Sequence, residues 1–386
     1  MFYKDFNDLR LSALGFGNMR LPTLEGGGID TNKADEMIAY AFENGVNYYD
    51  TAYGYHSGES ERFIGKSLSR FPRDSWYLAS KFPGYEKRPT WDPKEQFEEQ
   101  LKKCNVEYFD FYMLHNVYEH NVKTYLNPKW NIIDYLLVQK KSGRIRHFGI
   151  STHAGTETFS KFIEMYGDEI EFCQIELNAL DWTLQDAKAK YEILTARGIP
   201  IWVMEPVKGG KLASFSEDNE SKLKKARPNE SIAAWAFRWL QTLNLGVTLS
   251  GMTTLEQVKD NVKTFSGGQP LNDNEKQVYE GIIAGLTDLI PCTACRYCCE
   301  GCPQSLDIPT LLQLYNDCRF TPSMVACMAV DAMKPSKRPS ACIACEACIE
   351  VCPQNINVPE AFKDFQSILD KMERFVPPAE EHDDEN

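Results

Sequence analysis

Eleven of the thirteen cysteines in this 386-residue chain fall between positions 292 and 352. Eight of them form two copies of one pattern, with gaps of two, two and three residues and a proline after the last cysteine. The copies are Cys292, Cys295, Cys298 and Cys302, and Cys342, Cys345, Cys348 and Cys352. Thiolates at this spacing are typical ligands of [4Fe–4S] clusters. Zinc is the alternative, but a four-cysteine zinc site usually takes its ligands as two separated pairs.

Where two such motifs occur in one protein, the fourth cysteine of each motif binds the cluster of the other. The sequence therefore predicts two [4Fe–4S] clusters with exchanged ligands. One cluster takes Cys292, Cys295, Cys298 and Cys352, and the other takes Cys342, Cys345, Cys348 and Cys302. Cys299 adjoins Cys298 but breaks the spacing, and we expect Cys318 and Cys327 to be packed core thiols.

A second set of reactive side chains stands at the ends of successive β-rich segments. Asp50, Lys81 and His115 each close one such segment, and Tyr55 follows the first. The aspartate and lysine are 31 residues apart, and the lysine and histidine are 34 apart, which is about one strand–helix unit each. Because the carboxyl ends of parallel strands meet at one mouth, these side chains should converge there.

The four residue types suit proton donation to a carbonyl oxygen. A neighbouring ammonium would lower the pKa of a tyrosine below its usual value of about 10 and make the phenol a usable acid. Asp50 would hold Lys81 charged, and His115 would orient the carbonyl by a hydrogen bond. On chemistry alone, Tyr53 could take the place of Tyr55.

The elements that must position these residues alternate regularly over the first 265 residues. Helical stretches separate β-rich segments at a spacing near 30 residues, which predicts a parallel sheet. Eight such units favour a closed α/β fold, a TIM-type (β/α)8 barrel, over an open sheet. The predicted strands are 9–16, 47–52, 76–82, 109–115, 146–153, 172–177, 199–205 and 246–251.

Four regions follow from this organisation. The barrel should span 1–265, a linker with a bridging helix over 274–285 should span 266–290, and an acidic tail should span 377–386. The cysteine region, 291–376, is a second and smaller domain in which each motif precedes a helix-starting Asp or Asn and a proline. It resembles the mainly α-helical two-cluster ferredoxin domains of succinate dehydrogenase iron–sulfur subunits.

Composition excludes several classes of protein. The chain is 43% apolar and 25% charged, which is typical of globular proteins. Its net charge is −13 and no basic block stands out, so nucleic acid is not expected as a partner. No apolar run is long enough to predict a membrane span. Many cysteines without an apolar signal core predict a cytoplasmic location.

Residues 9–265 resemble the aldo-keto reductases. Residues 50–55 (DTAYGY) and 58–61 (GESE) match that family's signature around its aspartate and tyrosine, and the family spacing selects Tyr55 over Tyr53. Lys81 and His115 match the other two members of the catalytic tetrad, and residues 144–151 (RIRHFGIS) resemble the fifth strand. The resemblance implies an oxidoreductase with a nicotinamide cofactor.

The same resemblance implies cofactor contacts. Ser151 and Gln174 match positions that hold the carboxamide. The pyrophosphate loop is matched by Pro206, Val207, Gly209 and Lys211, and the adenosine end by Ser250, Gly251, Gln257, Asp260 and Asn261. Many members carry Lys and Arg at the positions of Gly251 and Gln257. The potassium-channel β-subunit branch shares the glutamine pattern and uses NADPH, so NADP(H) is favoured and NAD(H) is the alternative.

Three functions are consistent with these features. The first is NAD(P)H-dependent reduction of a small-molecule aldehyde or ketone, with Tyr55 as general acid. The second is electron transfer, in which the clusters exchange electrons with a partner ferredoxin or flavoprotein. The third is a non-catalytic subunit that senses the cofactor.

Overall fold

The computed structural model of this chain contains two compact units, Met1–Ile283 and Ala284–Asn386. The boundary between them falls inside the helix that was expected to bridge the domains, so most of that helix belongs to the first unit. Cys295, Cys327 and the expected acidic tail lie outside the described residues. The structure describes residues 1–84, 90–118, 121–184, 186–286, 289–290, 292, 296–320, 330, 333–352, 354 and 356–372.

The first unit is a barrel. Within the described residues, eight parallel strands close in the order β10-β3-β4-β5-β6-β7-β8-β9, which confirms the predicted fold class. The strands are β3 (Leu14–Gly17), β4 (Tyr48–Asp50), β5 (Tyr77–Phe82), β6 (Phe109–Val117), β7 (Ile145–Thr152), β8 (Phe172–Glu176), β9 (Ile201–Met204) and β10 (Thr248–Gly251).

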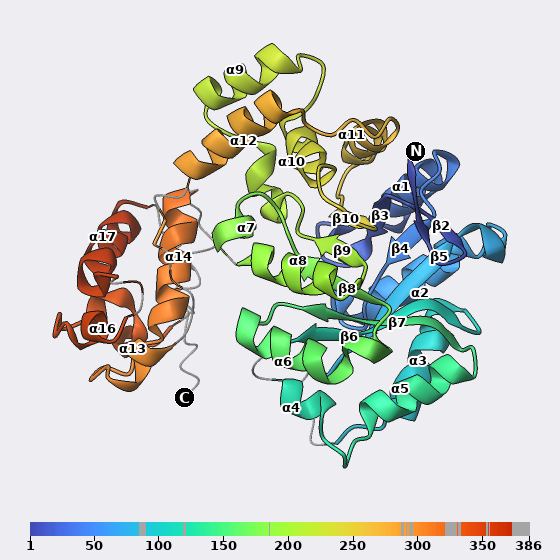
Figure 1. The fold of residues 1–386 in the computed structure, drawn as a ribbon, viewed down its shortest axis with the longest axis horizontal. Coiled ribbons are helices and arrows are strands. Elements are labelled where there is room, and N and C mark those ends of the chain that lie inside the picture. The colour runs from blue at the N-terminus through green and yellow to red at the C-terminus, as the bar shows by residue number, and fades with distance from the viewer. Residues whose placement is uncertain are drawn as a thin grey trace, which may run out of the picture. The chain divides into compact units, whose positions relative to one another are not determined.

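Helices surround this barrel (Figure 1). The crossover helices are α1 (Thr31–Glu43), α2 (Glu59–Leu68), α3 (Pro93–Cys104), α5 (Ile132–Lys141), α6 (Thr156–Tyr166), α8 (Ala187–Ala196), α10 (Ile232–Leu240) and α11 (Leu255–Phe265). The additional helices are α4 (Val122–Tyr125), α7 (Asp181–Leu184), α9 (Glu217–Ala226) and α12 (Asp273–Gly285). Local signals start several of them: Asp92 caps α3 directly before a proline, and Thr254 and Gln257 form a capping box on α11.

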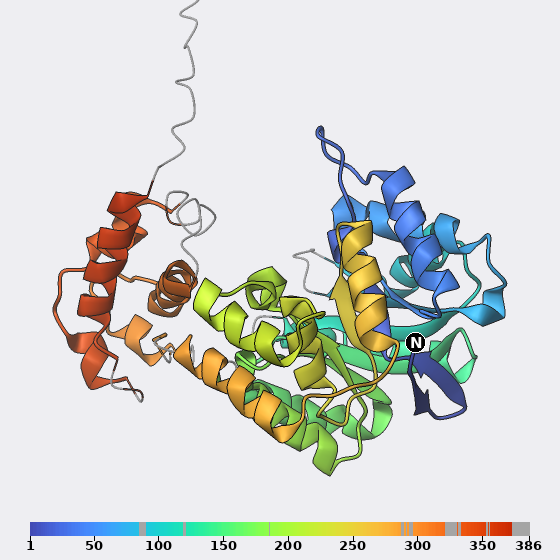
Figure 2. The same cartoon turned by 90° about the horizontal axis from the view of Figure 1, so that it is seen from above.

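The first predicted strand, 9–16, is two strands in the structure. Its first half, β2 (Leu9–Ser12), pairs antiparallel with β1 (Tyr3–Phe6), and only its second half joins the barrel as β3. This hairpin lies at one end of the barrel (Figure 2). Phe6 and Leu11 enter the interior core, where the Phe6 ring lies 5.0 Å from that of Trp202. Burial of these two apolar side chains explains why the segment bends back over the barrel.

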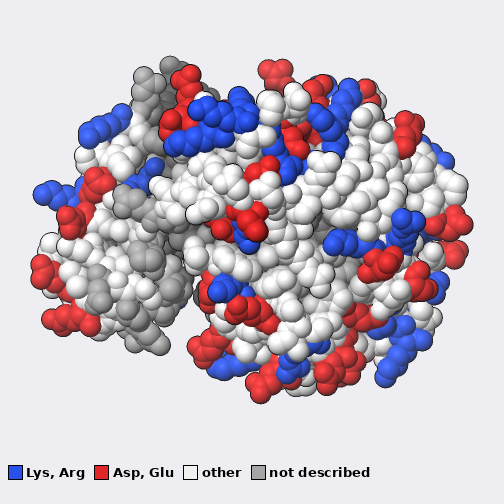
Figure 3. Space-filling model, turned by 45° about the horizontal axis from the view of Figure 1, so that its top comes forward, with Lys and Arg blue, Asp and Glu red and all other residues white. Residues whose placement is uncertain are grey.

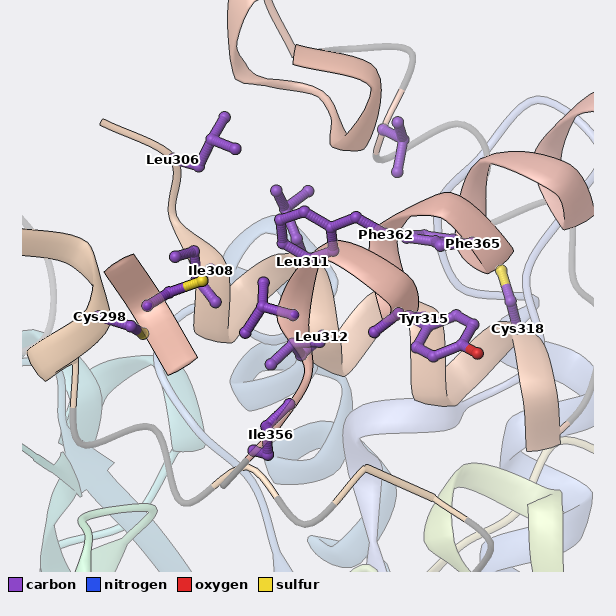
Figure 4. Close-up of a cluster of buried hydrophobic side chains, with 14 of the residues drawn as sticks. Cys298, Leu306, Ile308, Leu311, Leu312, Tyr315, Cys318, Ile356, Phe362 and Phe365 are labelled. Carbon is purple, nitrogen blue, oxygen red and sulfur yellow. The ribbon is translucent and has the colours of Figure 1, made fainter. Parts of the chain in front are cut away.

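The described residues of the second unit form helices joined by irregular segments and contain no strand. Its helices are α13 (Tyr297–Glu300), α14 (Ile308–Phe320), α16 (Ala347–Glu350) and α17 (Val358–Lys371). The core forms where α14 packs against α17, with Leu311 and Tyr315 facing Phe362 and Phe365 (Figure 4). The Tyr315 and Phe365 rings are 5.5 Å apart. This small core holds the two cysteine-bearing segments against one helix pair.

Charge is mixed on the surface drawn in Figure 3, where basic and acidic side chains are interspersed. Among the residues that the structure describes, no helix has the length and apolar character needed to cross a membrane.

Candidate active site and cysteine-lined cavities

Three neighbouring strands bring the predicted catalytic residues together. Asp50 ends β4, while Lys81 and His115 lie near the carboxyl ends of β5 and β6. Lys81 is fully buried, and its Nζ donates to Asp50 Oδ1 at 2.5 Å and to the Thr51 carbonyl at 2.8 Å. The same nitrogen lies 5.0 Å from the centre of the Tyr55 ring. A buried ammonium thus stands between its counter-ion and the face of the tyrosine.

The aromatic rings complete this constellation. The Tyr55 and His115 rings lie 5.9 Å apart and nearly perpendicular, at 83°. Tyr53, the rival on chemistry alone, instead directs its hydroxyl to Glu99 on α3 at 3.3 Å, and its ring lies 4.1 Å from Lys103 Nζ. Tyr55 is therefore the tyrosine that shares a site with Lys81 and His115.

A buried polar network behind β5 holds the strand that carries the lysine. Gln100 donates to the carbonyl of Lys81 at 3.0 Å and to Glu61 Oε1 at 2.6 Å. Glu61 also accepts from Ser80 and pairs with Lys103 at 3.0 Å. Because every partner in this network is buried, the network fixes the backbone at Lys81.

Electrostatics at the site differ from the expectation for the tyrosine. Burial, and then the carboxylates of Asp50 and Glu205, raise the pKa of Tyr55 well above its usual value. The predicted lowering by Lys81 is absent, because the ammonium is directed at Asp50 and lies over the ring face. Burial and the nearby Lys81 lower the pKa of His115 well below its usual value, so this imidazole is neutral at pH 7.

Two residues expected at the carboxamide of a nicotinamide lie side by side. Ser151 on β7 pairs in register with Gln174 on β8, and both are 2% exposed. Ser151 Oγ accepts from the Asn116 backbone N–H at 2.8 Å. Gln174 Oε1 is buried and accepts no hydrogen bond within the described residues. A buried acceptor without a donor is costly, and the amide of a carboxamide would satisfy it, so these residues fit the cofactor.

The loop after β9 carries the residues expected at the pyrophosphate. Pro206 is buried, Val207 and Lys211 are half-buried, and Gly209 is exposed. Gly209 and the next glycine have positive φ angles of 63° and 96°, which favour glycine, and the N–H of the second glycine donates to the carbonyl of Val207 at 3.0 Å.

Sequence reasoning missed the ionic cluster that anchors this loop. Lys208 Nζ contacts Glu176 at 2.7 Å and Asp181 at 3.0 Å. Asn178 joins the cluster by donating to Asp181 at 2.6 Å and to the carbonyl of Glu205 at 2.9 Å. The partners come from β8, α7 and the loop after β9, and no motif in the sequence links them.

The residues expected at the adenosine end surround the start of α11. Gly251 ends β10 and is exposed. Asn261 donates to Ser250 at 2.9 Å, Asp260 accepts from Ser231 at 2.5 Å, and Gln257 accepts from the backbone of Thr253 at 2.7 Å. The Gln257 bond lies at the amino end of α11, where a helix favours a phosphate, whereas Asp260 and Asn261 lie in the middle of the helix. Cofactor contacts by these side chains stay predictions.

The cysteines of the second unit line two separate cavities. The walls of one include Cys292, Cys298 and Cys352, and those of the other include Cys302, Cys342, Cys345 and Cys348. Each cavity therefore takes its distant cysteine from the other motif, in the exchanged pattern that the spacing predicts. Burial and then the neighbouring thiols, including that of Cys302, raise the pKa of Cys348.

The cysteines are spread around the walls of the two cavities. A zinc site needs four ligands about 2.3 Å from one point. Each iron of a [4Fe–4S] cube takes its own thiolate, so cysteines spread around a cavity wall are the expected arrangement.

Comparison with known proteins agrees with the barrel fold. The model of the "Aldo/keto reductase family" matches residues 13–280. The chain belongs to the aldo/keto reductase family. A second model, "4Fe-4S binding domain", matches residues 335–356, which contain the second cysteine motif.

Several relatives resemble the barrel. A probable aldo-keto reductase of Glycine max is 31% identical over 150 residues, and the match covers 36% of this chain and 41% of that protein. The NADH-specific methylglyoxal reductase of Escherichia coli is 24% identical over 309 residues, covering 67% of this chain and 91% of that protein. The holo structure of AKR11C1 from Bacillus halodurans aligns with a TM-score of 0.58 and 26% identity, over 73% of this chain and 96% of that one.

Proposed function

We propose that the first unit reduces an aldehyde or ketone with NAD(P)H, and that Tyr55 donates the proton to the carbonyl oxygen. The observation that carries this proposal is the buried pair of Asp50 and Lys81 beneath the Tyr55 ring. A fully buried ion pair brings a large desolvation cost. This ion pair lies beside a neutral histidine and a half-buried tyrosine at the barrel mouth. Its position there supports a catalytic role for the pair rather than a purely structural one.

Each residue has a distinct part in this reaction. Tyr55 is protonated at neutral pH, as phenols ordinarily are, and donates its proton to the developing negative charge on oxygen. Neutral His115 offers one ring N–H to orient the same oxygen. Lys81, held by Asp50, places positive charge beside the forming alkoxide. The nicotinamide, when bound, supplies the hydride.

The expected cofactor is NADP(H), with NAD(H) as the alternative. Buried Gln174 and Ser151 support a bound carboxamide, but they do not distinguish the two dinucleotides. The Escherichia coli relative is named NADH-specific, so both must be measured.

The test is Tyr55→Phe. We expect carbonyl-dependent oxidation of NAD(P)H by a panel of aldehydes and ketones to fall by roughly 100- to 10,000-fold, the range of general acid catalysis. Dinucleotide affinity and iron content should not change. Tyr53→Phe is the matched control, because that ring faces α3, and it should keep activity. Full turnover by the Tyr55 variant would contradict the assignment. Binding of dinucleotide without turnover of any carbonyl would favour a cofactor-sensing subunit.

The second unit supports a second candidate function. Two [4Fe–4S] clusters with exchanged ligands would exchange electrons with a ferredoxin or flavoprotein partner. The supporting observation is that Val351 and Ile343, one on the wall of each cavity, are 46% and 58% exposed. Both clusters would therefore lie close to the surface. A reducing cytoplasm would suit such thiolate-bound clusters.

Anaerobic mixing separates the two candidates. Clusters pass single electrons, whereas nicotinamide passes a hydride. Electron exchange between the two therefore needs a flavin as mediator. NADPH or NADH is added to protein with oxidised clusters, and the clusters are followed by visible absorbance and EPR. We expect bound dinucleotide and oxidised clusters. Reduction of the clusters would instead show that electrons pass from the dinucleotide to the second unit.

A further inference from the structure

The two cysteine motifs belong to an internal repeat, and the walls of the two cavities follow it. A shift of 50 residues carries Cys292, in the first cavity, onto Cys342, in the second. The same shift relates other residues of one wall to residues of the other wall. Such pairs are Pro309 and Pro359, Gln354 and Gln304, and Ile356 and Leu306. Because these pairs are identical or similar, the two cavities offer nearly the same surroundings to a cluster.

One pair of equivalent wall positions carries opposite charges. Arg296 lines the first cavity, and Glu346, its counterpart in the repeat, lines the second. Both residues have a left-handed backbone, with φ angles of 66° and 62°, and each stands directly before the short helix of its motif. Apart from the cysteines, they are the only residues with a charged side chain among the described wall residues. The repeat therefore conserves the backbone here and reverses the charge.

Charges behind the walls modify this contrast. Arg296 pairs with Asp307 at 3.0 Å, and both side chains are about half exposed, so solvent and the carboxylate weaken the field of the guanidinium. Near the second cavity, Lys337 Nζ donates to the carbonyls of Gln304 and Ser305, at 2.9 Å each. Lys337 is absent from the described wall residues, whereas Glu346 is one of them. We therefore expect the glutamate to dominate at the second cavity.

A charge beside an iron–sulfur cluster changes its reduction potential, because reduction adds one negative charge. A nearby cation stabilises the reduced form and raises the potential, and a nearby anion lowers it. We infer that the cluster of the first cavity has the higher reduction potential, and that Arg296 and Glu346 set the difference between the clusters. The inference rests on the candidate electron-transfer function, because it requires both clusters. It deepens that function by giving it a direction: one electron from a ferredoxin or flavoprotein donor, which is thereby oxidised, collects on the cluster beside Arg296.

Potentiometric titration followed by EPR tests this inference on the full chain. The protein is prepared anaerobically with about eight irons, as two clusters require, and is reduced stepwise with dithionite. The wild type should show two reduction steps. Arg296→Gln should shift the upper step to lower potential, whereas Glu346→Gln should shift the lower step to higher potential. The double variant should narrow the gap between the steps.

Two further variants separate charge from structure. Arg296→Lys keeps the positive charge and should titrate nearly as the wild type does. Lys371→Gln removes one positive charge from an exposed position at the end of α17, away from both cavity walls, and should shift neither step appreciably. Added salt should narrow the gap of the wild type, because Arg296 and Glu346 are both exposed to solvent.

The outcomes are distinct. If Arg296→Gln shifts the lower step, or shifts neither step, the inference is wrong, while two reducible clusters continue to support electron transfer. The same holds if Glu346→Gln shifts the upper step. If the wild type cannot be loaded with two clusters, or if its clusters accept no electrons, both the inference and the candidate electron-transfer function are overturned.

Discussion

At the scale of single residues, the most informative group is Lys81. Its ammonium is fully buried and is satisfied by one carboxylate oxygen and one backbone carbonyl. Breaking a buried pair by removing one partner costs more than the pair contributes, because the remaining charge stays buried. Stability and catalysis can therefore be separated at this site.

Lys81→Met should lower both stability and activity. It leaves Asp50 buried and unpaired, which costs about 3–5 kcal/mol. Urea unfolding followed by tryptophan fluorescence measures this loss in the first unit, because all seven tryptophans lie before residue 240. The double variant Asp50→Asn/Lys81→Met should regain most of the stability but no activity. Recovery of activity in the double variant would exclude a catalytic role for the pair.

The buried carboxyl group of Asp181 should make the stability of the first unit depend on pH in an unusual direction. Burial, and then the adjacent Glu176 carboxylate, raise the pKa of Asp181 to about 7 against the opposing pull of Lys208. In the unfolded chain this carboxyl ionises near its ordinary pKa of 3.8. The folded protein therefore binds the extra proton between these values, and stability falls as the pH rises through that window.

Asp181→Asn should flatten this slope. A pKa difference of one unit corresponds to about 1.4 kcal/mol, so the wild type should lose at least about 1 kcal/mol more than the variant between about pH 5 and pH 7. Denaturant titrations at several pH values measure the difference. Parallel curves for the two proteins would show that Asp181 is ionised throughout.

Part of the site could be predicted from the sequence, because that part depends on residue types and on their spacing. Strand-end positions about one strand–helix unit apart located Asp50, Lys81 and His115, and family spacing chose Tyr55. The raised pKa of Tyr55 could not be predicted from the sequence, because it depends on burial and on the carboxylates of Asp50 and Glu205, the second of which lies far away in the chain.

At the scale of elements, helix α2, which follows Tyr55, packs closely against the end of α3 at one glycine. Gly65 in α2 faces the backbone of Cys104 at the end of α3, and a Cβ there would overlap that carbonyl group. By contrast, Gly281 in α12 has no described atom within 4 Å of the position of its Cβ. The two helical glycines thus predict opposite results for one substitution.

Gly65→Ala should destabilise the first unit by about 1–3 kcal/mol, because backbone atoms must move to admit the methyl group. It should also lower activity, since α2 begins four residues after Tyr55. Gly281→Ala should stabilise by about 0.5–1 kcal/mol, the usual gain in a helix. Equal effects of the two substitutions in urea unfolding would contradict the close packing of α2 on α3.

Among the elements, regular alternation predicted the barrel because each unit repeats the same pattern. The first strand was wrongly predicted as one element because apolar residues recur along the whole of 9–16. That pattern does not reveal that Leu11 packs into the interior core from a hairpin, whereas Leu14 begins the barrel strand.

At the scale of the whole molecule, the exchanged cysteines make the two motifs interdependent. Cys352 lines the same cavity as Cys292 and Cys298, although it belongs to the second motif. Cys352→Ser should therefore remove the cluster of the first motif and halve the iron content from about eight to about four atoms per chain. Iron analysis and Mössbauer or EPR spectra measure this.

The spectra identify which cluster is lost. Cys352→Ser should resemble Cys298→Ser and differ from Cys348→Ser. Cys299→Ser is the matched control, because Cys299 adjoins Cys298 but is absent from the walls of both cavities, and it should keep all iron. If Cys352→Ser instead resembles Cys348→Ser, each motif binds its own cluster.

The seam that closes the barrel sets the order of events during biosynthesis. Thr248 of the last strand pairs beside Leu14 of the first, and the backbone of Phe2 donates to the carbonyl of Phe265. A nascent chain emerges amino end first, so the barrel cannot close until nearly all of the first unit has left the ribosome. The first motif cysteine, Cys292, leaves the ribosome after the barrel residues do. The barrel can thus be complete before iron is needed, and iron starvation should yield molecules with a folded reductase unit and an empty second unit.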